Sequence, residues 1–230
     1  MIDVILWDLD NTVLDFDYSE ESSIRYCFNK LNLGVCTDEM LAEYREINAK
    51  YWHLLELGEL TQEKVLVERF VEFFENHGID KDLELPFDDM YEEHLPDFVR
   101  WVPGAKETIL ALKNRCRQYL VTNGAKDVQR SKLKSTGLGD LLDGVFISAE
   151  IGAQKPSKPF FDIVFKKIGD CPPETVLIVG DSLTSDMRGG VNAGIKTCFY
   201  NPSGKPVKTE LRLDYTVENI SDVINIHELG

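Results

Sequence analysis

Two acidic side chains, spaced two residues apart, follow an apolar run at the start of the chain. Residues 4–7 (Val-Ile-Leu-Trp) predict a buried strand, and Asp8 and Asp10 come directly after it. Because side chains two apart lie on the same face of a strand, we expect both carboxylates to point the same way. Such carboxylates repel each other unless a cation or a shared proton lies between them. The pair costs stability and therefore indicates a chemical site.

Three more polar clusters follow short apolar runs in the second half of the chain. They begin at Thr122-Asn-Gly, at Lys155-Pro and at Gly180-Asp181, with Asp186 five residues beyond the last. Each cluster alone is a common turn, loop or helix start. If all four clusters lie at the carboxyl ends of parallel strands, however, they converge on one point, where ligands bind in open α/β sheets.

The chemistry that these clusters suit is phosphoryl transfer through an aspartyl phosphate. This reaction needs a carboxylate nucleophile and a hard divalent cation with oxygen ligands, most simply Mg²⁺. It also needs donors that hold the phosphoryl oxygens and a general acid that afterwards acts as a base. The residues that can fill these roles are Asp8, Asp10, Thr122, Lys155 and Asp181.

The elements that position the clusters alternate between strand and helix from residue 103 onward. The predicted strands are 2–8, 119–122, 145–148, 176–180, 197–200 and 215–217. The predicted helices between and after them are 103–114, 126–136, 159–168, 185–193 and 221–229. Short, continuously apolar strands that alternate with helices are typical of a parallel sheet covered on both faces. The expected fold is therefore α/β, with a Rossmann-like parallel sheet as its core.

Residues 16–98 have a different pattern, rich in Glu and aromatic residues and almost without strand signal. Helical spacing of apolar side chains predicts helices at 19–33, 38–57, 61–78 and 83–95, with Thr61 as an N-cap and Gly78 as a helix end. The expected organisation is an α/β catalytic domain of residues 1–15 and 99–230, interrupted by an all-α helical-bundle domain of residues 16–98.

Composition limits the location and partners of the protein. The net charge of −15 opposes binding to a nucleic acid polymer. No apolar run approaches the roughly 20 residues that span a bilayer, so no membrane partner is expected. The five cysteines form no C-x-x-C pair, which argues against a disulfide framework or a zinc site and fits a reducing compartment. Without a basic leader, the chain is expected to be cytoplasmic.

At this point the sequence resembles the haloacid dehalogenase-like (HAD) superfamily of phosphohydrolases. Asp8-Leu-Asp-Asn-Thr12 is similar to the first motif of that family, and Thr122-Asn-Gly to the second. Lys155-Pro-Ser-Lys-Pro-Phe is similar to the third, and Gly180-Asp with Asp186 to the fourth. The resemblance covers the whole chain and includes a helical cap inserted after the first strand.

The resemblance implies a different role for each carboxylate. Asp8 would be the nucleophile and Asp10 the general acid and base. Mg²⁺ would be bound by Asp8, by the backbone carbonyl of Asp10 and by Asp181, with Asp186 in a supporting or water-mediated place. Asn11 stands where many members carry glycine, which leaves this chemistry intact.

The resemblance also implies how the phosphoryl group is held. Thr122 and Asn123 would contact it together with Lys155, which directly precedes a proline as the lysine of the family does. Members that are dehalogenases lack a carboxylate at the position of Asp10. Its presence therefore favours a small-molecule phosphate ester as the substrate.

Within the superfamily, the stretches 51–53 and 58–61 and the run 181–190 look most like the pyrimidine or non-standard nucleotide 5′-nucleotidases. In the cap, Trp52 is a candidate for stacking on a base, and Arg69 for contact with a substrate anion. Both also suit ordinary packing or solvated positions. A sugar-phosphate or phosphoglycolate phosphatase and a phosphomutase of the same fold remain alternatives. A receiver-type signalling module fits less well, because its nucleophile belongs on a middle strand and it needs no helical insertion.

Overall fold

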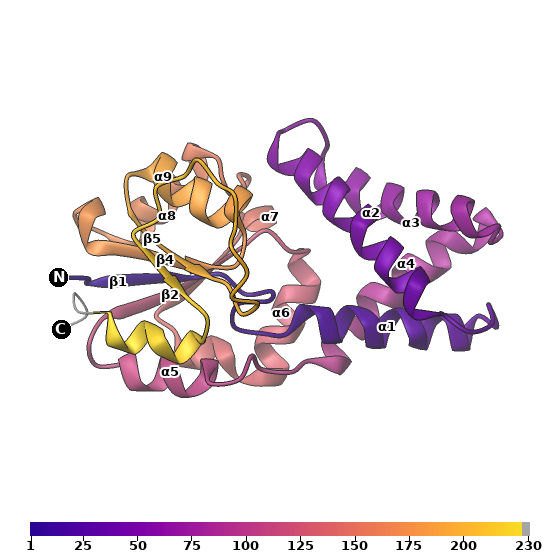
Figure 1. Ribbon diagram of the computed structural model, residues 1–230, viewed down its shortest axis with the longest axis horizontal. Helices are drawn as coiled ribbons and strands as arrows, with labels where there is room; N and C mark the ends of the chain where they lie inside the picture. Colours follow the sequence, from indigo (N-terminus) through magenta and orange to yellow (C-terminus); the bar gives the residue numbers. More distant parts are fainter. Residues whose placement is uncertain (227–230) are drawn as a thin grey trace. The chain divides into compact units, whose positions relative to one another are not determined.

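The computed structural model describes residues 1–226, and in it the chain forms two compact units (Figure 1). The α/β unit contains Met1–Phe16 and the chain from Arg100 onward, and the helical unit contains Asp17–Val99. None of the helices in this described part of the chain is both long and apolar enough to cross a membrane.

The α/β unit is built on a sheet of six parallel strands in the order β3-β2-β1-β4-β5-β6. Their bounds are β1 (Val4–Trp7), β2 (Arg117–Thr122), β3 (Gly144–Ile147), β4 (Val176–Gly180), β5 (Lys196–Tyr200) and β6 (Tyr215–Val217). Val4 of β1 pairs with Arg117 on one side and with Val176 on the other. All four residues of β1 are buried, as expected of a strand covered on both faces. The predicted α/β fold with a parallel sheet is confirmed.

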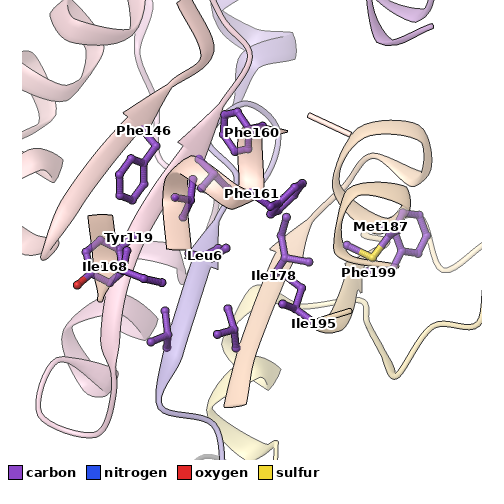
Figure 2. Close-up of a cluster of buried hydrophobic side chains, with 14 residues drawn as sticks. Leu6, Tyr119, Phe146, Phe160, Phe161, Ile168, Ile178, Met187, Ile195 and Phe199 are labelled. Carbon is purple, nitrogen blue, oxygen red and sulfur yellow. The ribbon is translucent and has the colours of Figure 1, made fainter. Parts of the chain in front are cut away.

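Helices connect the strands and cover the sheet. They are α5 (Ala105–Leu112), α6 (Lys126–Thr136), α7 (Ser148–Ile151), α8 (Lys158–Ile168) and α9 (Arg188–Ala193). Phe160 and Phe161 of α8 pack with Leu6 and Ile178 in an apolar cluster (Figure 2). Gln118 of β2 accepts a hydrogen bond from the indole of Trp7 and donates one to the carbonyl of Ile109 in α5. Side chains thus pack closely around β1, the strand that leads into the first acidic cluster.

Two elements near the end of the chain differ from the predicted helices. The predicted helix 185–193 is a π-helical turn, η5 (Leu183–Met187), followed by α9. The predicted helix 221–229 is replaced by a 3₁₀ segment, η6 (Ile220–Asn225), and residues 227–229 of that prediction lie outside the described part of the chain. Short 3₁₀ segments at the end of a domain carry little periodicity, so sequence patterns separate them poorly from α-helix.

The helical unit is organised around buried aromatic rings. Its helices are α1 (Phe16–Lys30), which starts at the boundary residue, α2 (Asp38–Glu56), α3 (Gln62–His77), α4 (Glu84–His94) and the 3₁₀ turns η1 (Lys81–Leu83) and η2 (Leu95–Phe98). Thr61 caps α3 by accepting a hydrogen bond from Lys64, and Gly78 ends it with φ +62°. The ring of Phe70 stacks on Tyr44 at 5.0 Å and meets Phe87 edge-on. These contacts fit the apolar face that helical spacing predicts.

Candidate active site

Neighbouring strand ends bring three carboxylates together. Asp8 follows β1, and Asp181 and Asp186 follow β4, the strand next to it. The backbone N–H of Asp8 donates to the carbonyl of Val179 at 2.9 Å, which fixes the chain as it leaves the sheet. One oxygen of each carboxylate lies within 4.8 Å of one oxygen of each of the others. The cluster lies at the carboxyl edge beside the first strand, where successive connections of the sheet run in opposite directions.

Lys155 supplies the positive charge of this cluster. Its ammonium group donates to Asp8 Oδ1 at 2.6 Å, to Asp186 Oδ1 at 2.7 Å and to the carbonyl of Val121 at 2.9 Å. The residue is only 1% exposed. Since an ammonium has three hydrogens, all of them are used in this arrangement. Lys155 therefore orients the carboxylate of Asp8, and contact with a phosphoryl group requires that it share or exchange one of these bonds.

The carboxylates outnumber the cations at the site. Burial, together with repulsion from Asp186, raises the pKa of Asp8 to about 7 against the attraction of Lys155. Burial and the charges of Asp8 and Asp186 raise the pKa of Asp181 well above its usual range. Burial opposes the charge of Lys155, but the carboxylates of Asp186 and Asp8 outweigh it and raise the pKa of that ammonium. One lysine does not neutralise three carboxylates, so the fold holds negative charge in excess.

This donor set fits Mg²⁺. Carboxylate oxygens are the ligands that hard divalent cations prefer, and a cation among them removes the repulsion that raises the carboxylate pKa values. Thr12 donates to Asp181 Oδ1 at 3.2 Å and helps to orient it. Asp186 already accepts from Lys155 with one oxygen and from the backbone N–H of Ser182 with the other, at 3.1 Å. Asp8 and Asp181 therefore fit a direct ligand role, and Asp186 fits the supporting one.

Two backbone positions make the close packing of the site possible. Asn11 lies in the left-handed region with φ +60°, and its side chain accepts a hydrogen bond from the backbone N–H of Phe16. Gly180 lies against Asp186, because a Cβ at this position would be 2.2 Å from Asp186 Oδ2. The glycine that precedes Asp181 is thus required by the carboxylate of Asp186, six residues after the glycine.

The second and third clusters are tied together by Asn123. Its amide donates to the carbonyl of Lys155 at 2.8 Å and accepts from the backbone N–H of Lys155 at 2.9 Å. The side chain thus holds the backbone that carries the lysine. Contact of Asn123 with a phosphoryl group stays a prediction, and in this arrangement its side-chain amide is already engaged. Thr122 is buried at the end of β2.

Asp10 is held by two residues that sequence reasoning missed. Its Oδ1 accepts from Lys132 Nζ at 2.7 Å, and its Oδ2 accepts from Gln129 Nε2 at 2.6 Å. Both donors belong to α6 and are buried. A signal for them exists, because they lie beside Val128 and Leu133 on the apolar face of an otherwise polar helix. A lysine on such a face needs a buried partner.

The two candidate residues of the helical unit differ in their surroundings. Trp52 is half-buried in α2. Arg69 is 2% exposed, and its guanidinium donates to the carbonyl of Leu66 at 3.1 Å and to Asn48 and Asp88, each at 3.3 Å. The expected contact of Arg69 with a substrate anion does not fit this structure, because the side chain is enclosed and used in the interior of the helical unit. The partners of Arg69 lie on three helices of the unit. Local sequence patterns do not reveal such contacts, and this is why the expected role differs from the observed position.

The chain is similar to known proteins over most of its length. Residues 5–200 match the family described as haloacid dehalogenase-like hydrolase. The chain is 34% identical to YfnB, named as a HAD-hydrolase of Bacillus subtilis, over 96% of this chain and 94% of that protein. A crystal structure of YfnB bound to magnesium superposes with a TM-score of 0.91 and 33% identity, covering 98% of each chain.

Two pyrimidine 5′-nucleotidases are similar over nearly the whole length. PynA of Streptococcus pneumoniae is 31% identical over 96% of this chain and 93% of its own length. YjjG of Escherichia coli is 27% identical over 96% of each chain.

Proposed function

The chain belongs to the haloacid dehalogenase-like hydrolase family, and from this membership we propose that it hydrolyses phosphate monoesters through a phosphoaspartyl intermediate on Asp8. The observation that carries the proposal is the buried cluster in which Asp8 lies with Lys155, Asp181 and Asp186. Asp10, two residues on, supplies the carboxyl group that distinguishes ester hydrolysis from the dehalogenase chemistry of the same family.

In the first step an oxygen of Asp8 attacks the phosphorus atom. The new bond joins this oxygen to phosphorus, while the bond from phosphorus to the ester oxygen breaks. Asp10, protonated at that moment, gives its proton to the departing oxygen, so that the alcohol leaves neutral. Lys155 fixes the attacking carboxylate through its 2.6 Å bond to Oδ1. In this proposal Thr122, at the neighbouring strand end, donates to a phosphoryl oxygen.

In the second step Asp10, now a carboxylate, takes a proton from water. The water oxygen bonds to phosphorus, the bond to Asp8 breaks, and inorganic phosphate and the free Asp8 carboxylate remain. Asp8 and Asp181 would hold Mg²⁺, which would screen the carboxylate from the negative phosphoryl group. The relative YfnB binds magnesium, and this supports the same assignment here.

The substrate class that we propose is the nucleoside 5′-monophosphates. Support comes from the two pyrimidine 5′-nucleotidases that match over 96% of this chain. Trp52 remains the candidate for stacking on the base, since it is half-buried rather than enclosed. Sugar phosphates and phosphoglycolate are the competing substrates, and a phosphomutase is the competing reaction.

We further propose that residues 17–99 act as a cap that selects the substrate. Both connections to this unit leave the α/β unit side by side, because the Asp15 N–H donates to the Arg100 carbonyl at 2.8 Å and the Val102 N–H to the Val13 carbonyl at 3.0 Å. Two adjacent linkers are suited to a hinge. The magnesium-bound structure of YfnB is described as revealing interdomain movement, which supports a mobile cap in this chain as well.

The test is release of inorganic phosphate from a panel of nucleoside monophosphates, sugar phosphates and phosphoglycolate, with Mg²⁺ or with excess EDTA. We expect turnover only with Mg²⁺, highest with a nucleotide, and without any bisphosphate activator. Asp8→Asn serves as the inactive control. Turnover in EDTA, or near-normal turnover by Asp8→Asn, would refute the mechanism. Best activity on a sugar phosphate would refute only the substrate class.

A further inference from the structure

The carboxylate of Asp10 has both of its oxygens held by one helix. Lys132 Nζ lies 2.7 Å from Oδ1 and Gln129 Nε2 lies 2.6 Å from Oδ2. Lys132 is 2% exposed and Gln129 is fully buried, so neither is a surface residue that contacts Asp10 by chance. With each oxygen bonded to a different donor, the plane of the carboxylate is fixed.

Gln129 also connects Asp10 to Thr122. Its Nε2 donates to Thr122 Oγ1 at 2.8 Å as well as to Asp10, so the two hydrogens of the amide nitrogen serve two site residues. Thr122 Oγ1 accepts a second bond from the backbone N–H of Gly124 at 3.1 Å. Because both acceptor positions of the hydroxyl are then filled, its own hydrogen is left to donate elsewhere. Gln129 thereby sets the direction in which Thr122 can donate.

The local backbone is shaped to admit this glutamine. A Cβ at Gly124 would lie 2.1 Å from Gln129 Nε2 and 2.5 Å from its Cδ. Any other residue in place of the glycine would displace the amide from Asp10 and Thr122. The glycine of the Thr-Asn-Gly cluster is therefore explained by the approach of Gln129.

Lys132 is placed by packing as well as by charge. Its ammonium lies over the ring of Phe16, 5.0 Å from the ring centroid, and it pairs with Asp10 Oδ1 at 2.7 Å. Burying a lysine costs free energy unless it is paired, and the proposed chemistry does not itself use this charge. Its partner is the residue that transfers protons in that chemistry.

We propose that Lys132 and Gln129 are positioning residues, which hold Asp10 in the orientation for proton transfer and align the hydroxyl of Thr122 with it. This inference rests on the proposed phosphatase function and deepens it. Misplacement of a proton-transfer group by about 1 Å can cost 10²-fold in rate, within the 10²–10⁴-fold that such a group supplies. Replacing Lys132 or Gln129 should therefore slow only those reactions whose rate is limited by proton transfer.

The test compares two esters of similar shape whose leaving groups differ in their need for a proton. Nitrophenolate is a weak base and leaves p-nitrophenyl phosphate without being protonated. Phenolate is more basic, so its departure from phenyl phosphate is helped by a general acid. For Lys132→Met we expect kcat/KM on phenyl phosphate to fall about 10- to 100-fold and on p-nitrophenyl phosphate less than about threefold. A burst of nitrophenol should appear, because attack by water on the phosphoenzyme still needs Asp10 as the base.

The controls distinguish a positioning role from a general loss of activity caused by a disturbed fold. Lys134→Met changes an exposed lysine of the same helix in the same way and should alter neither ester. Lys132→Arg restores a cationic donor and should recover part of the loss on phenyl phosphate. If Lys132→Met does not fold, Gln129→Met keeps nearly the size of the side chain, removes the donor without adding charge and should give the same difference between the esters.

Equal losses on both esters without a burst would overturn the inference and leave the phosphatase function standing. No loss on either ester would overturn it as well. Absence of turnover of both esters by the wild-type protein would instead overturn the proposed function, and this inference with it.

Discussion

Replacing Asp8 by Asn should abolish turnover and, without a divalent cation, should make the protein more stable. The nucleophile is buried beside Asp186, and these surroundings raise its pKa from 3.8 to about 7. At pH 8 its carboxylate is therefore ionised at a cost to the folded state. Asparagine has nearly the same shape and carries no charge, so it removes that cost.

The magnitude follows from proton linkage. A pKa raised from 3.8 to about 7 corresponds to roughly 4 kcal/mol of lost stability at pH 8. This value already includes the attraction of Lys155 for the carboxylate, so the lost bond from that ammonium is not deducted again. The expected gain is therefore on the order of 4 kcal/mol, or roughly 8–16 °C in the melting temperature of a chain of this length.

The gain should depend on pH in a defined direction. Between pH 3.8 and about 7 the folded wild-type protein binds the Asp8 proton more tightly than the unfolded chain does. Its stability therefore falls as pH rises through this window and levels off above it. The advantage of Asp8→Asn should accordingly be near zero at pH 4 and fully developed at pH 8.

Thermal unfolding in EDTA at pH 4, 6 and 8 measures this difference. Asp140→Asn, which changes an exposed aspartate of the α/β unit, is the matched control and should show no such dependence on pH. Mg²⁺ at 100 times its dissociation constant should then stabilise the wild type by about 2.7 kcal/mol and so offset much of this difference, because the variant lacks a ligand. A variant that melts below the wild type in EDTA at pH 8 would refute the reasoning.

Four further outcomes are expected. Ca²⁺ should fail to replace Mg²⁺ in turnover assays, because its larger and looser coordination does not hold the reacting oxygens in place. Gly180→Ala should weaken magnesium binding or kcat about 10- to 100-fold, since its Cβ would displace Asp186; normal titration and turnover would contradict this. Arg69→Met should cost about 3–5 kcal/mol in unfolding experiments by leaving the largely buried carboxylate of Asp88 unpaired, and should lower activity on all substrates together. Trp52→Ala should instead change the ranking of nucleotides against p-nitrophenyl phosphate at nearly constant melting temperature, and parallel losses would argue against a role in selection.

Much of the fold is predictable from this sequence because its signals are local. Continuous apolar runs such as 176–180 predict strands that are covered on both faces, and β4 has those same bounds. Thr61 and Gly78 mark the ends of α3 through hydrogen bonding and backbone conformation that depend on single residues. The convergence of the polar clusters follows from topology, since the carboxyl ends of adjacent parallel strands share one edge.

The partners of each side chain at that edge are not predictable in the same way. Sequence reasoning gave Lys155 and Asn123 to the phosphoryl group, whereas the structure bonds the lysine to Asp8 and Asp186 and the asparagine to the lysine backbone. Gln129 reaches Asp10 across 119 positions of the chain. Such bonds depend on the side-chain rotamers and distances that packing selects. They cannot be predicted from the spacing of residues along the chain.

The balance of buried charge separates the functional cluster from a structural one. In the helical unit, buried Arg69 faces Asp88, and buried Glu20 accepts from Arg45 and Asn48, so opposite charges occur in pairs. Such pairs are compatible with folding alone. In the α/β unit, Lys155 is shared between carboxylates and the cluster keeps an excess of negative charge. Such an excess is relieved by a proton or by a bound cation, which is why the carboxylate cluster, and not the buried arginine, indicates where a cation and a phosphate ester bind.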